Sequence, residues 1–122
     1  MRRFRFMMLA VLVLLVQGCA SATPPTPVTS LDQLVGKWTG TVTIGRSVTF
    51  LWLTIEPDRT LIAIWGSITA RGTVTMAGGQ ASFQMAPPPQ EGTITLYTGK
   101  GKPQIYMESR DGSFYATVEP QN

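Results

Sequence analysis

The chain has 122 residues, a single cysteine and no histidine, and its formal net charge is +3. These counts exclude a disulfide within the chain and a catalytic pair that needs histidine. The positive charge comes from Arg2, Arg3 and Arg5, since the chain's ten Lys and Arg without these three leave seven, against seven Asp and Glu. The rest of the chain is neutral and offers no strongly basic surface, so we expect no nucleic-acid partner.

Residues 1–18 have the pattern of a secretory signal peptide. The three arginines precede an unbroken apolar run from Met7 to Val16, and small residues follow at Gly18-Cys19-Ala20. This run is half the length of about twenty residues that a membrane-spanning helix needs. We therefore expect residues 1–18 to direct export and then to be removed.

The only cysteine lies at the end of this segment. Val16-Gln17-Gly18-Cys19 resembles the lipobox of bacterial lipoproteins, whose cysteine receives a diacylglycerol, becomes the first residue after cleavage and is usually acylated again. The resemblance implies lipidation of Cys19 and stable anchoring on the extracytoplasmic side of a bacterial envelope. Ala20 replaces the aspartate that retains many Gram-negative lipoproteins in the inner membrane, which favours the outer membrane in such an organism. The alternative is an ordinary cleaved signal that contains a cysteine.

Residues 19–30 are predicted to be a tether. After Cys19 they are small and polar, with prolines at positions 24, 25 and 27. This composition favours a disordered, solvated spacer that reaches up to about 30 Å in extended form. Ser30 and Gln33 have the spacing of a capping box and predict one short helical turn after the tether.

Residues 31–122 are long enough for one modest domain. Strict alternation of apolar and polar residues predicts antiparallel strands with one solvent-exposed face. Turn signals separate them at Gly45-Arg46, Pro57-Asp58, Gly78-Gly79 and Asp111-Gly112. Gly66-Ser67 fits either a turn or a bulge, so the count is seven or eight strands. The predicted strands cover residues 38–44, 48–55, 61–65, 72–76, 81–85, 92–96, 105–107 and 114–118.

Short connections and the lack of a substantial helix predict an all-β, up-and-down antiparallel barrel. Gly36-Lys37-Trp38 resembles the Gly-x-Trp motif that opens the first strand of lipocalins and related calycins. The resemblance implies a small lipocalin-like barrel in which Trp38 packs across the closed end. An eight-stranded barrel is just wide enough to be filled by side chains or to hold one small ligand.

The segment 48–55 breaks the alternation because both of its faces are apolar. Phe50 and Trp52 point opposite to Leu51, Leu53 and Ile55. One set fills the interior. We expect the other to face a covering segment of the same domain (the tether or the loop at Pro87), a protein partner or second copy, the membrane surface, or a ligand-lined lumen.

The sequence predicts no catalytic site, no metal site and no cofactor. Glu56 and Asp58 flank Pro57, as expected of a turn rather than of an acid-base pair. Gly99-Lys100-Gly101-Lys102 lacks the Walker spacing and a following helix, so we expect a solvated loop.

Three functions fit this pattern. The first is a non-enzymatic, membrane-anchored envelope lipoprotein whose barrel binds another protein or serves as a structural module. The second is a lipocalin-like carrier of a small apolar ligand, and the third is a periplasmic enzyme inhibitor. The candidate contact residues for a ligand or partner are Trp38, Phe50, Trp52, Trp65 and Phe83.

Overall fold

The computed structural model describes residues 24–99 and 101–121, so the predicted signal peptide and Cys19 lie outside the described residues. The domain is all-β apart from one short 3-10 helix, as predicted. Gly66-Ser67 is a turn between two strands, which settles the count at eight. The elements are η1 Leu31–Gln33, β1 Gly36–Ile44, β2 Ser47–Ile55, β3 Thr60–Trp65, β4 Ile68–Ala77, β5 Gln80–Ala86, β6 Gln90–Tyr97, β7 Gln104–Ser109 and β8 Phe114–Pro120.

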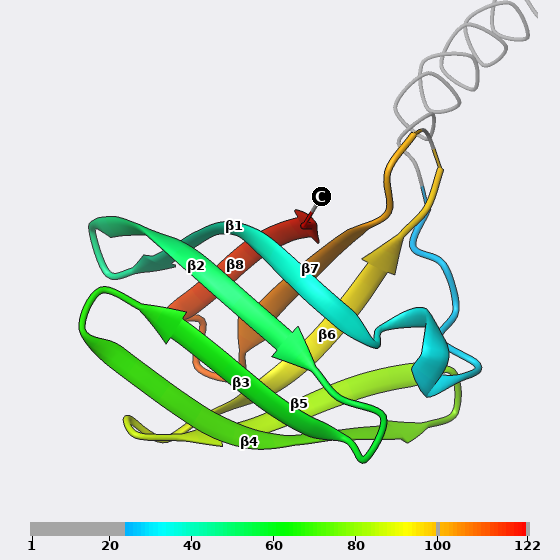
Figure 1. Cartoon of the computed structure of the whole chain (residues 1–122), viewed down its shortest axis with the longest axis horizontal. Helices are drawn as coiled ribbons and strands as arrows, with labels where there is room; N and C mark the ends of the chain where they lie inside the picture. Colours follow the sequence, from blue (N-terminus) through cyan, green and yellow to red (C-terminus); the bar gives the residue numbers. More distant parts are fainter. Residues whose placement is uncertain (1–23, 100, 122) are drawn as a thin grey trace, which may run out of the picture.

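The eight strands form a closed barrel in which each strand pairs antiparallel with the next (Figure 1). The barrel closes where β1 pairs with β8, from Trp38 opposite Pro120 to Ile44 opposite Phe114. Closure leaves no unpaired sheet edge between these strands. The predicted up-and-down barrel is therefore confirmed.

Tight turns connect the strands at the positions that the sequence indicates. Gly45 has φ of +61°, and Gly78 and Gly79 have φ of +59° and +78°, values that suit the primed turns of twisted hairpins. At Pro57-Asp58 the backbone N–H of Arg59 donates to the carbonyl oxygen of Glu56 over 3.0 Å. These short turns make consecutive strands neighbours.

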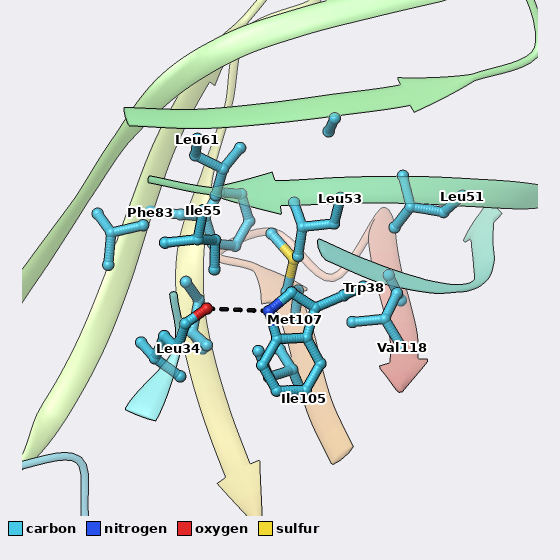
Figure 2. Packing of buried hydrophobic residues seen from close by; sticks show 14 of the residues in the cluster. Leu34, Trp38, Leu51, Leu53, Ile55, Leu61, Phe83, Ile105, Met107 and Val118 are labelled. Carbon is cyan, nitrogen blue, oxygen red and sulfur yellow. Dashed lines mark hydrogen bonds between the residues drawn. The ribbon is translucent and has the colours of Figure 1, made fainter. Parts of the chain in front are cut away.

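Inward-facing side chains fill the barrel. Trp38 lies near one end, where its indole Nε1–H donates to the carbonyl oxygen of Leu34 over 2.9 Å (Figure 2). Toward the other end the ring of Phe114 packs against Trp65 and Phe83, with centroids 5.6 and 6.1 Å apart. The interior is thus one continuous apolar core.

The chain before β1 belongs to this core, which corrects the expectation of a fully solvated tether. Val28 is only 4% exposed and Leu34 is fully buried. The backbone N–H of Thr26 donates to the carbonyl oxygen of Leu96 over 2.6 Å, and that of Val28 to Gly79 over 3.2 Å. The predicted capping box of Ser30 and Gln33 is present on η1. The segment from Thr26 onward docks on the barrel and closes one end.

Three inward-facing glycines allow neighbouring strands to approach closely. A Cβ atom at Gly40, Gly72 or Gly92 would lie 1.9, 1.7 or 1.8 Å from a backbone carbonyl oxygen of the adjacent strand. Backbone atoms of a paired strand cannot move away without loss of the ladder. These positions therefore require glycine for steric reasons, as is common where strands bend sharply in small barrels.

We predict that Gly72→Ala lowers the free energy of unfolding by about 3 kcal/mol or more, because its methyl group would overlap the Gln84 carbonyl oxygen. Urea unfolding followed by tryptophan fluorescence measures this loss. The matched control is Gly101→Ala, where φ is +77° but no atom lies within 4 Å of the new Cβ. We expect that variant to lose only about 1 kcal/mol. Equal losses in both variants would contradict the steric explanation.

Candidate functional site

The structure divides the five predicted contact residues into two groups. Trp38, Trp65 and Phe83 point inward and are only 4%, 4% and 2% exposed. Phe50 and Trp52 lie on the outer wall and are 49% and 46% exposed. The five residues therefore do not form one site.

The inward group belongs to the packed core. Figure 2 shows Trp38 among the side chains of Leu53, Ile105 and Met107, close to Leu34. Trp65 and Phe83 both pack against Phe114 from neighbouring positions in the interior. These aromatic residues fill the barrel where a carrier would need space for a ligand.

The outward group lies on an apolar surface that spans two neighbouring strands. Phe50 and Trp52 stack edge to face on β2, with ring centroids 4.5 Å apart and an interplanar angle of 62°. Ile64 on β3 lies directly opposite Trp52 in the ladder, and Val48 precedes Phe50 on the same face of β2. We call these four exposed residues, Val48, Phe50, Trp52 and Ile64, the outer apolar surface.

Uncharged residues border this surface on the next strands. Thr41 and Thr39 of β1 pair with Phe50 and Trp52, and Thr69 of β4 pairs with Ile64. The outer apolar surface and its threonine border therefore carry no formal charge. Such a surface resembles the low-charge centre of a protein interface more than an ordinary solvated sheet face.

No described segment covers the outer apolar surface, so the expectation that the tether or the Pro87 loop buries it is wrong. The docked tether lies instead against Leu96 of β6 and Gly79 of the β4–β5 turn. The loop at Pro87 joins β5 to β6, across the barrel from β2. No segment within residues 24–99 and 101–121 therefore buries the outer apolar surface.

The outer wall of β4 to β7 contains a polar hollow of about 570 Å³ that sequence reasoning missed. Arg110 forms an ion pair with Glu91 over 3.1 Å, and the Gln84 amide donates to the same carboxylate over 3.5 Å. Thr93 and Glu108 add further hydrogen-bonding groups. The sequence indicates only that these side chains point outward, from the alternation along each strand. Their gathering depends on the register in which β4 to β7 pair, which no local pattern reveals.

The turn carboxylates have the structural roles that the sequence indicates. Hydrogen bonds from Thr60 lower the pKa of Asp58. The pKa of Asp111 falls to about 2, because its carboxylate accepts hydrogen bonds from the Ser113 backbone N–H, the Ser113 hydroxyl and the Ser109 hydroxyl. Both carboxylates stabilise turns by accepting hydrogen bonds in their charged form.

Within residues 24–99 and 101–121, no three Asp, Glu, Cys or His side chains come together in a way that could hold a metal ion. The same part of the chain contains no helix with the length and hydrophobicity needed to cross a bilayer. Comparison with protein-family models, curated proteins and solved structures found no match to this chain. The candidate site is therefore defined by its geometry alone, and the outer apolar surface is its clearest feature.

We predict that Asp111→Asn lowers the melting temperature by a few degrees at pH 7. The folded pKa of about 2 lies below the unfolded value of about 3.8, so the charged carboxylate stabilises the fold above pH 4. This stabilisation disappears as the pH falls toward 2. Thermal unfolding from pH 7 to pH 2 should therefore show the gap between the two proteins closing between about pH 4 and pH 2. A gap that stays constant over that window would contradict the assignment.

Proposed function

We propose that this chain is a lipid-anchored lipoprotein of the bacterial envelope whose barrel is a non-enzymatic, protein-binding module. The anchor is Cys19, on the basis of the signal pattern and the lipobox resemblance. The observation that carries the binding role is the outward placement of Phe50 and Trp52, half exposed on the wall of a closed barrel. Large aromatic residues at the centre of an interface are frequent anchors of binding energy.

The geometry of the surface favours contact through side chains. Because the barrel is closed, a partner cannot add a strand to a free edge of the sheet. It can instead pack against the outer wall of β2 and β3, where the edge-to-face pair of Phe50 and Trp52 forms an apolar centre. The partner is another protein or a second copy of this chain.

The packed interior argues against the carrier alternative. A bound apolar ligand would have to displace Trp38, Trp65 or Phe83, each of which is buried among other core side chains. Nothing in the described geometry favours the inhibitor alternative over a general protein-binding role. The absence of histidine from the chain supports a non-enzymatic module.

The anchor is tested by Cys19→Ala. We expect the wild-type protein to fractionate with membranes and to carry acyl mass on its amino-terminal peptide, because the thiol is the attachment point of the lipid. The variant should appear in the soluble fraction after export and should lack the acyl mass. Ser21→Ala is the matched control, and it should behave like the wild type. Membrane association that is unchanged in Cys19→Ala would contradict the anchor.

The binding surface is tested by a photo-crosslinking amino acid placed at Trp52 in producing cells. We expect a crosslinked product at position 52 that is absent when the same amino acid replaces Thr75, which lies on the wall of β4 away from this surface. Phe50→Ser should abolish the product while lowering the free energy of unfolding by about 1 kcal/mol or less, because this ring is half exposed. Mass spectrometry identifies the product as a second copy or another protein. Equal products at positions 52 and 75, or none, would contradict the proposal.

A further inference from the structure

The docked tether leaves the barrel beside one loop. Thr26 pairs antiparallel with Leu96 near the end of β6, and the hydroxyl groups of Thr26 and Thr98 are hydrogen-bonded over 2.6 Å. Because the pairing is antiparallel, residues before Thr26 run toward the β6–β7 loop, residues 98–103. Figure 1 shows the first described residues beside this loop, which projects from the barrel.

Little chain remains between this point and the predicted lipid. Seven residue steps separate Cys19 from Thr26, the first described residue that is hydrogen-bonded to the barrel, and an extended chain of that length at about 3 Å per residue spans roughly 21 Å. A fully solvated tether would reach up to about 30 Å. Docking of residues 26–30 therefore shortens the reach of the anchor to roughly two thirds.

We propose that the β6–β7 loop faces the bilayer and contacts lipid headgroups. This inference rests on the proposed lipidation of Cys19. The short free tether brings the loop to the membrane surface, since the chain leaves the barrel beside Thr98. Residues 98–103 contain no carboxylate, and the exposed Lys102 supplies a cation for headgroup phosphates.

The same placement assigns different roles to the other surfaces. The β1–β2, β3–β4, β5–β6 and β7–β8 connections lie at the opposite end of the barrel, because the strands alternate in direction. The outer apolar surface lies on the side wall of β2 and β3. It therefore lies outside the loop end that we propose to face the bilayer.

The orientation can be measured with fluorescent labels at the two ends of the barrel. Cys19 is the only cysteine and its thiol is occupied in the lipidated protein, so a second cysteine can be labelled selectively. Gly99→Cys places the label on the β6–β7 loop and leaves Lys102 in place, and Ser67→Cys places it on the exposed β3–β4 turn at the far end. The full-length lipidated protein is reconstituted in phosphatidylcholine–phosphatidylglycerol vesicles that contain a headgroup spin-labelled lipid as quencher.

We expect quenching at position 99 to be several times stronger than at position 67. Equal quenching, or stronger quenching at position 67, would overturn the inference. A flexible Gly-Ser insert between Ala22 and Thr23 lengthens the free tether and should reduce quenching at position 99 toward that at position 67. Quenching that the insert leaves unchanged would show that the short tether does not set the orientation.

The acyl mass on Cys19 is measured on the same preparation. If Cys19 carries no lipid, the proposed anchor fails and the orientation fails with it. If Cys19 is acylated but the two labels are quenched alike, the anchor stands and only the orientation is overturned.

Discussion

The pairing of β1 with β8 is the interaction on which the rest of the structure depends. Without it, eight meandering strands would leave two unpaired edges and an open apolar face. With it, the wall has a fixed circumference that the inward side chains must fill. Gly40 lies in this seam, where a Cβ atom would lie 1.9 Å from the Thr117 carbonyl oxygen. The seam can therefore close only around a residue without a side chain.

Closure also fixes which apolar residues remain outside. Side chains alternate across the wall, so a register that buries Leu51, Leu53 and Ile55 forces Phe50 and Trp52 outward. The barrel interior has no room for both sets. Burial of the outer apolar surface on a partner would yield about 25 cal/mol for each Å² of apolar area removed from water. The constraint that builds the core thus also creates the candidate binding surface.

More of the fold than of the candidate site could be predicted from the sequence. Period-two alternation and glycine-containing turns identify strands such as β4 and β5, because both signals are local. The choice between the two faces of β2 is not local, since Phe50 and Leu51 are both strongly apolar and only the closed register separates them. The docking of Thr26 on Leu96 is a backbone contact, which leaves no pattern in the side chains. The polar hollow on β4 to β7 escaped prediction because its residues come from four strands and are brought together only by strand pairing.

The segment before β1 links the fold to the proposed anchor. Leu34 closes the end of the barrel by burying its side chain and by accepting the hydrogen bond of the Trp38 indole. The chain that performs this closure is continuous in sequence with Cys19, so its docking on the core would restrict where the proposed anchor can lie. Because the tether leaves beside β6 and the outer apolar surface lies on β2 and β3, lipid and protein partner would use separate parts of the barrel. Anchoring and binding can then occur together without competition for one surface.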